Sequence, residues 1–207
     1  YDEILYLDFD VVPLKNDNFF EHWDLTKGIA VLNNNDRTIP IERVNDTSQT
    51  IRSPSSKYFN AQAMLFEKGL STKNDVINTG IVGINKEHLD KLDYFNHFED
   101  NLTMMKHLKI QTREEVIFPD DETGEVKIRK HNDKYVTNIF PDKVRQYFGW
   151  DNETLFSVKL KENKVPVQWL DDKWHYFLSS QGFIPKETIL VHAINKDFDL
   201  CWRRYNA

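Results

Sequence analysis

The fold is decided by the stretch Ile4-Leu-Tyr-Leu-Asp-Phe-Asp-Val-Val-Pro13, a strand-forming apolar run that contains two aspartates, Asp8 and Asp10. Carboxylates spaced i, i+2 on a strand point to the same face, and at a strand end their oxygens can converge on one hard cation. The simpler interpretation is a strand that ends in a turn before Pro13. Burial of the apolar neighbours, however, draws both charges toward a low-dielectric core, which is costly unless a cation compensates. The run therefore predicts a site for Mg²⁺ or Mn²⁺ that could neutralise a phosphate.

Strand-like and helix-like segments alternate along the chain, which is the pattern of an α/β domain. Strands are expected at residues 4–12, 28–32, 61–66, 77–84, 164–170 and 188–192. Helical spacing occurs at residues 86–98 and 101–108. The polar stretch 33–56 predicts a long surface loop, and residues 118–124 predict a hairpin followed by a charged strand at 125–130.

Composition restricts the classes of partner and compartment. The 207 residues carry 27 basic and 33 acidic side chains, and this net charge of −6 provides no basic field for a nucleic acid. Cys201 is the single cysteine, so no intramolecular disulfide can form and a reduced, cytoplasmic setting is expected. No apolar run approaches the roughly 18 to 20 residues that span a bilayer, so we expect no transmembrane segment.

Two enzyme families place Asp-x-Asp after a hydrophobic strand. Residues 4–13 resemble the metal-binding Asp-x-Asp of nucleotide-sugar glycosyltransferases with the GT-A fold. They also resemble motif I of haloacid-dehalogenase-type phosphatases, in which the first aspartate accepts a phosphoryl group and the second is an acid/base. The phosphatase motif lies on the first strand of its domain, as Asp8 and Asp10 do here. The choice between the two families therefore depends on the other segments of the chain.

A second segment, Val76-Ile-Asn-Thr-Gly-Ile-Val-Gly-Ile-Asn85, also occurs in glycosyltransferases. It is similar to a segment of retaining enzymes related to glycogenin and to bacterial lipopolysaccharide galactosyl- and glucosyltransferases. Gly80 would permit close approach of a ligand, and the Asn78 amide offers a donor and an acceptor to sugar hydroxyls. The resemblance implies that Asn78, Thr79 and Gly80 orient the donor sugar. A plain turn followed by a strand is the alternative.

A third segment, Trp150-Asp-Asn-Glu-Thr-Leu-Phe-Ser157, resembles the helix start of that family. Asp151 or Asn152 would be the N-cap of a helix from Glu153, which places polar groups at a positive helix end. The resemblance implies that Asp151 and Asn152 line the reactive face of the sugar. If a carboxylate nucleophile is needed, Asp151 is the first candidate and Glu153 the second.

Residues 165–176 follow with Val-Pro-Val-Gln-Trp-Leu-Asp-Asp-Lys-Trp-His-Tyr, which looks like the family's edge strand and Leu-Asp-x-x-Trp-Asn turn. His175 replaces the asparagine that members of the family have after the tryptophan, so the resemblance assigns no direct role to this position. Trp174 is the tryptophan that we place toward the sugar, because indoles stack on the C–H faces of sugar rings. Core packing is the general alternative for large aromatics.

The last segment, Ile189-Leu-Val-His-Ala-Ile-Asn-Lys196, resembles the family's C-terminal His and Lys segment. The resemblance implies that His192 completes the metal site at a strand end and that Lys196 contacts the diphosphate. A neutral imidazole beside two carboxylates is a competent Mn²⁺ ligand. The spacing from His192 to Lys196 is shorter than in many relatives, so Arg203 and Arg204 are alternative phosphate contacts.

The phosphatase interpretation lacks its other motifs. It needs a strand-end Ser or Thr, a Lys and a later acidic pair, and the acidic candidate Asp120-Asp121 lies in the expected hairpin tip. A phosphatase and a non-catalytic carbohydrate-binding protein stay as alternatives.

The sequence thus predicts one catalytic domain over residues 1–207, α/β in class, with a GT-A-like (Rossmann-like) mixed sheet flanked by helices. The family places further nucleotide-binding strands before the Asp-x-Asp strand, so we expect an incomplete domain whose activity alone is uncertain. The expected reaction is metal-dependent hexosyl transfer, with retention of configuration, from a nucleoside-diphosphate sugar. The acceptor would be a hydroxyl of a glycan, lipid or protein, and the metal Mn²⁺ or Mg²⁺.

Overall fold

The computed structural model describes residues 1–37, 53–110, 129–131, 134–136, 152–178 and 182–206. Its contacts divide the chain into two compact units, where the sequence predicts one domain. Unit 1 comprises Tyr1–Asn33, Asn78–Lys91 and Val165–Ala207, and unit 2 comprises Asn34–Ile77 and Leu92–Lys164. The protein is a mixed α/β chain, as expected, and each unit is described by itself below.

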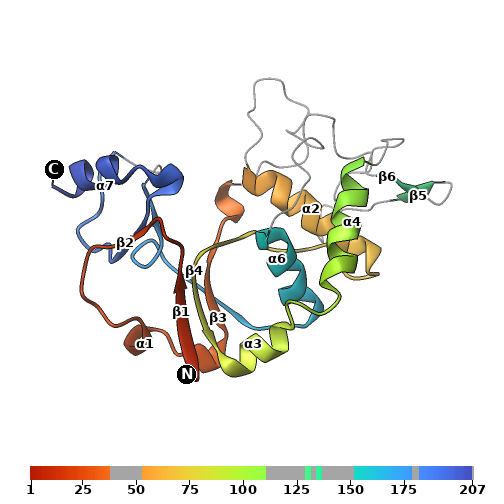
Figure 1. The fold of residues 1–207 in the computed structure, drawn as a ribbon, viewed down its shortest axis with the longest axis horizontal. Helices are drawn as coiled ribbons and strands as arrows, with labels where there is room; N and C mark the ends of the chain where they lie inside the picture. The colour runs from red at the N-terminus through yellow and green to blue at the C-terminus, as the bar shows by residue number, and fades with distance from the viewer. Residues whose placement is uncertain (38–52, 111–128, 132–133, 137–151, 179–181, 207) are drawn as a thin grey trace. The chain divides into compact units, whose positions relative to one another are not determined.

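Unit 1 contains a mixed sheet of four strands. In spatial order these are β1 (Glu3–Leu7), β4 (Ile77–Asn85), β3 (Ile29–Asn33) and β7 (Val167–Trp169). β1 and β4 run antiparallel side by side (Figure 1), whereas β3 and β7 are parallel. β4 is buried along nearly its whole length because it lies between β1 and β3, and its apolar run suits a strand that is covered on both faces. β1 lies at the edge, where most of its residues are exposed.

A second mixed sheet in unit 1 has three short strands. Their order is β2 (Val11–Pro13), β9 (Leu190–His192) and β8 (Tyr176–Phe177). β2 pairs antiparallel with β9, and β8 pairs parallel with it. The strand predicted at residues 4–12 is therefore two strands in two sheets, because the chain turns at Asp8–Asp10.

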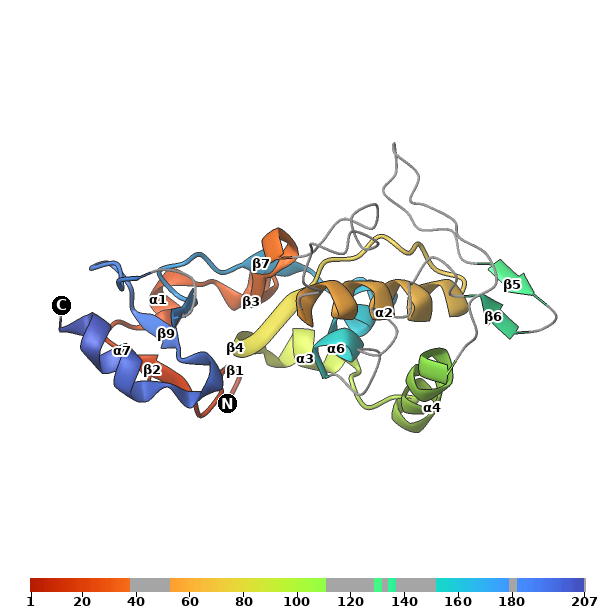
Figure 2. The ribbon, with the colours of Figure 1, turned by 90° about the horizontal axis from the view of Figure 1, so that it is seen from above.

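Helices and two apolar clusters complete unit 1. The helical elements are α1 (Phe19–His22), η1 (Leu25–Lys27), α3 (Lys86–Leu92), η5 (Ile194–Lys196) and α7 (Phe198–Tyr205). One cluster of buried residues gathers around Phe19, Ile81 and Trp174. The other joins α7, through Cys201, to Tyr176 and Val191 of the second sheet, beside which α7 lies in Figure 2.

Unit 2 is mainly helical. Its elements are η2 (Asn35–Arg37), α2 (Ser53–Glu67), α4 (Phe98–Ile110), the hairpin strands β5 (Arg129–His131) and β6 (Lys134–Val136), and α6 (Asn152–Glu162). α2 packs against α4 and α6 (Figures 1 and 2) through a core that includes Phe59, Met64, Met105 and Leu155. The hairpin predicted at residues 118–124 lies outside the described residues.

The prediction of a strand at residues 61–66 is wrong, because these residues form the second half of α2. Ala61, Ala63, Met64 and Leu65 are all buried, and a short apolar run of this kind fits a buried strand and a buried helix equally well. Alanine, methionine and leucine favour the helix, and the run lacks the β-branched residues of a strand. Pro54, in the first turn of α2, also fits a helix start. α2 thus begins inside the stretch 33–56 that was predicted to be a loop.

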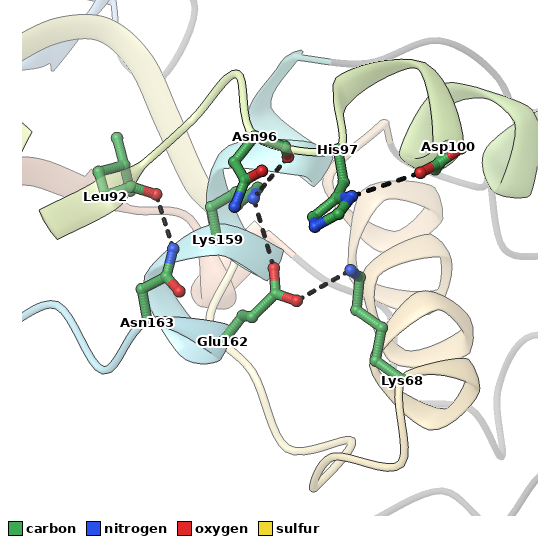
Figure 3. Close-up of polar contacts among 8 residues, drawn as sticks. All are labelled: Lys68, Leu92, Asn96, His97, Asp100, Lys159, Glu162 and Asn163. Carbon is green, nitrogen blue, oxygen red and sulfur yellow. Dashed lines mark hydrogen bonds and ion pairs between the residues drawn. The ribbon is translucent and has the colours of Figure 1, made fainter. Parts of the chain in front are cut away.

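A buried lysine connects two segments of unit 2 (Figure 3). Lys159 of α6 donates to the backbone carbonyl of Asn96 at 2.9 Å and lies 3.6 Å from a carboxylate oxygen of Glu162. Lys68, which directly follows α2, pairs with the other oxygen of Glu162 at 2.9 Å. Asn163 donates to the carbonyl of Leu92 at 2.8 Å. The network holds the segment between α3 and α4 against α6, so its charged groups have a structural role.

Among the described residues, no helix combines the length and the apolar character that crossing a membrane requires.

Candidate metal centre

The backbone around Asp8 and Asp10 is held at three points. The Asp8 amide donates to the carbonyl of Gly80 at 2.8 Å, which extends the pairing of β1 with β4 by one residue. The Val11 amide donates to the carbonyl of Asp8 at 3.0 Å and closes a turn. The Ala193 amide donates to the carbonyl of Asp10 at 2.8 Å. The turn that carries both carboxylates is therefore fixed to both sheets of unit 1.

His192 reaches the same point from the far end of the sequence. It is the last residue of β9 and lies opposite Val11 in the antiparallel pairing of β2 with β9. Its Nε2 atom is 3.3 Å from Oδ1 of Asp10. Asp8, Asp10 and His192 each offer a ligand atom, and these three atoms all lie within 4.8 Å of one another. The three residues predicted to bind a metal thus lie together.

This donor set fits a divalent cation. Two carboxylates this close repel each other, and a cation between them would remove that repulsion. Carboxylate oxygens suit Mg²⁺ and Mn²⁺, and the added imidazole nitrogen shifts the preference toward Mn²⁺ and other transition metals. Asp8 and Asp10 are half-buried while His192 is buried, so the carboxylate side of the cluster keeps contact with solvent.

Tyr6 supports the first carboxylate. Its hydroxyl donates to Oδ1 of Asp8 at 2.5 Å, as expected for side chains two apart on one strand face. This hydrogen bond is the main cause that raises the pKa of Tyr6, and burial and the charges of Asp8 and Asp10 act in the same direction. Tyr6 therefore stays a neutral donor to Asp8.

Gly80 has a specific packing role next to His192. A Cβ atom at this position would lie 2.4 Å from Cε1 and 2.6 Å from Nδ1 of the His192 ring, closer than real Cβ contacts allow. The missing side chain therefore lets the imidazole approach β4. The neighbouring Asn78 accepts from the Gly80 amide through Oδ1 at 3.0 Å, and Thr79 is buried. That Asn78, Thr79 and Gly80 also orient a sugar stays a prediction.

Lys196 lies beside the turn that carries the carboxylates. Its ammonium group is 4.7 Å from the ring centroid of Phe9, the residue between Asp8 and Asp10. Phe9 is 73% exposed, and Lys196 is exposed as well. A positive charge thus stands near the two aspartates and in contact with solvent. Of the alternatives, Arg204 donates to the carbonyl of Leu178, and Arg203 donates to that of Asp199 at 3.3 Å.

Trp174 does not face a site, contrary to the prediction from the sequence. It is only 3% exposed and packs edge-to-face on Phe19, with the ring centroids 5.3 Å apart, in the core of unit 1. Its indole faces are therefore not available for stacking on a sugar. The core alternative for this aromatic residue is the correct one.

The predicted nucleophile candidates belong to the start of α6, in unit 2. α6 begins at Asn152, one residue before the predicted helix start at Glu153. Asp151 lies outside the described residues. Glu153 is buried and forms an ion pair with Lys57 of α2. This pairing gives Glu153 a structural task within unit 2, since it compensates a lysine that is itself mostly buried.

Replacement of Glu153 by glutamine is therefore expected to destabilise unit 2. The variant leaves the Lys57 ammonium without its carboxylate, and we expect a loss of about 2 kcal/mol in unfolding free energy. Chemical denaturation monitored by circular dichroism measures this loss. The double variant Lys57→Met/Glu153→Leu, which removes both charges, should recover most of it. Unchanged stability of Glu153→Gln would contradict the structural role.

His175 was not predicted to take part in the site, and neither was Tyr6. The Nε2 atom of His175 is 3.0 Å from Nδ1 of His192, and the two imidazoles are both buried. Two signals pointed toward His175. His175 replaces an asparagine of the resembling family, and a histidine just before an apolar strand has to be placed next to a polar partner.

Comparisons with protein-family models, with curated proteins and with solved structures found no match. The function proposed below therefore rests on the geometry of unit 1 and on the resemblance of its motifs.

Proposed function

We propose that the protein is a metal-dependent glycosyltransferase that moves a sugar from a nucleoside-diphosphate donor to an acceptor hydroxyl. The observation that carries the proposal is the convergence of Asp8, Asp10 and His192, whose ligand atoms lie within 4.8 Å of one another. His192 lies more than 180 positions after the two aspartates in the sequence, and its convergence with them is what the resemblance to GT-A enzymes implies.

A bound Mn²⁺ or Mg²⁺ would supply the charge that neutralises the diphosphate leaving group. The chain's own residues create the conditions for this. Asp8 and Asp10 would hold the cation on the side of the cluster that keeps contact with solvent, where a charged donor can approach. His192 would be the ligand on the buried side. The backbone hydrogen bonds of Asp8 and Asp10 fix the carboxylate turn, and the pairing of β2 with β9 places His192 next to it.

Lys196 is the second positive group of the proposed site. It lies next to Phe9, on the exposed side of the carboxylate turn, and can pair with a phosphate that the cation does not neutralise. Its flexible side chain is suited to a point-charge contact of this kind. Of the predicted sugar contacts, Gly80 lies against the His192 ring, and Asn78 accepts from the Gly80 amide.

A phosphatase is disfavoured by the same cluster. Among the described residues, the group that joins Asp8 and Asp10 is a buried imidazole, whereas the phosphatase interpretation requires a further acidic pair. The acidic candidate for that pair, Asp120-Asp121, lies outside the described residues. Mg²⁺-dependent hydrolysis of p-nitrophenyl phosphate is the assay that identifies a phosphatase.

The test is a thermal-shift screen of UDP- and GDP-sugars with Mn²⁺, with Mg²⁺ and with EDTA. We expect Mn²⁺ to raise the melting temperature, a subset of donors to raise it further only with the metal, and EDTA to reverse both shifts. Donors that bind should then be hydrolysed slowly or transferred to an acceptor hydroxyl. A flat response to every donor in the presence of Mn²⁺ would reject the proposal for this chain, and glycan binding unaffected by EDTA would indicate a binding protein instead.

A further inference from the structure

The structure places a second histidine directly behind the proposed metal ligand. His175 precedes β8, and the parallel pairing of β8 with β9 sets Phe177 opposite His192. The Nε2 atom of His175 is 3.0 Å from Nδ1 of His192, while Nε2 of His192 faces Asp10 at 3.3 Å. The His192 ring thus has its two nitrogens assigned to different partners.

His175 cannot itself contact a cation or a substrate from this position. Its relative exposure is 0%, and Phe177 packs against both imidazoles, with ring centroids 5.0 Å from His175 and 5.4 Å from His192. Any effect of His175 on the site has to pass through His192. Such residues behind metal-bound histidines usually orient the ring and fix its tautomer.

The backbone holds His175 firmly in place. Its amide donates to the carbonyl of Asp171 at 3.0 Å, and the preceding Trp174 amide donates to Oδ1 of Asp171 at 3.2 Å. The Trp174 side chain is anchored in the core of unit 1. Gly80 of β4 leaves room for the His192 ring. The two imidazoles are therefore held between a rigid turn and β4.

We propose that His175 is a positioning residue that accepts a hydrogen bond from Nδ1–H of His192. This fixes the His192 tautomer in which Nε2 carries the lone pair toward Asp8 and Asp10. The inference rests on the proposed function, because it assigns Nε2 of His192 to the cation.

Two variants separate hydrogen bonding from packing. His175→Gln keeps an acceptor close to the position of the histidine Nε2 but loses the ring. His175→Phe keeps an aromatic ring next to Phe177 but removes the acceptor. We expect Mn²⁺ affinity, measured by isothermal titration calorimetry, to fall 10- to 100-fold in His175→Phe and to stay within about threefold of wild type in His175→Gln. The reverse order would show that His175 only fills space and would overturn the proposal.

A second readout needs no metal. Nitrogen-15 NMR of the histidine rings in the metal-free protein reports which nitrogen of His192 carries the proton. We expect a proton on Nδ1 in wild type and in His175→Gln, and its displacement to Nε2 in His175→Phe. A proton on Nε2 in wild type, with Nδ1 accepting from His175, would overturn the inference. If wild type binds no Mn²⁺ but shows the expected tautomer, the proposed function fails while the His175–His192 hydrogen bond stands.

Discussion

Replacement of Asp10 by asparagine is expected to abolish stabilisation of the protein by Mn²⁺. Asp10 supplies one of two charged oxygens and is the carboxylate closest to His192, at 3.3 Å. Asparagine keeps the shape and one oxygen but removes the charge that makes cation binding favourable. At a Mn²⁺ concentration a hundredfold above its dissociation constant, wild type should gain about 2.7 kcal/mol. For a chain of this length that gain corresponds to a melting-temperature shift of roughly 5 to 10 °C, which the variant should lose.

Asp172→Asn is the matched control. Asp172 is exposed and lies outside the metal cluster, so this variant changes the net charge equally and should keep the full shift. Calorimetric titration with Mn²⁺ checks that the loss in Asp10→Asn is a loss of binding. An equal Mn²⁺ shift in Asp10→Asn and wild type would remove Asp10 from the site and would leave the convergence of the three residues without a metal role.

Much of this site could be predicted because its parts are local in sequence. The apolar strands that precede Asp8–Asp10 and His192 can each be recognised from a short stretch of sequence. Polar side chains are common at strand ends, where the chain leaves the core. The prediction of one strand over residues 4–12 missed the break between β1 and β2, since Phe9, Val11 and Val12 suggest that the strand continues. The pairing of β2 with β9, which brings His192 to Asp10, depends on register between segments far apart in sequence.

The wrong predictions for residues 61–66 and for Trp174 have a common physical cause, because burial of a side chain depends on tertiary packing. The apolar run 61–66 could be buried as a helix or as a strand, and its packing against α6 stabilises the helix α2. The large apolar surface of Trp174 could stack on a sugar or pack in a core, and in the structure it packs on Phe19 in the core of unit 1. The contact of His175 with His192 could not be predicted, because the two residues are 17 positions apart and meet only through the pairing of β8 with β9. Gly80 shows the same dependence, since the His192 ring occupies the space next to it.

Replacement of Gly28 by alanine is expected to be among the most destabilising single changes in unit 1. Gly28 has φ of +151°, a conformation that residues with a side chain rarely adopt. A Cβ atom here would lie 2.7 Å from both the carbonyl carbon and oxygen of Pro166, and 2.9 Å from the amide of Val167. These are backbone atoms of the β3–β7 pairing, in which the Ile29 amide donates to the carbonyl of Pro166 at 2.9 Å. Relief of the clash therefore requires the two strands to separate.

The expected cost is about 4 kcal/mol in unfolding free energy, because the strain of the backbone conformation adds to the loss of strand pairing. Gly69→Ala separates the two contributions. Gly69 also has positive φ, +67°, but no atom lies within 4 Å of the added Cβ, so only the conformational cost of roughly 1 kcal/mol remains. Urea denaturation of both variants measures the difference. Similar losses in the two would show that β3 and β7 can separate at little cost, and that the close approach at Gly28 does not hold the sheet together.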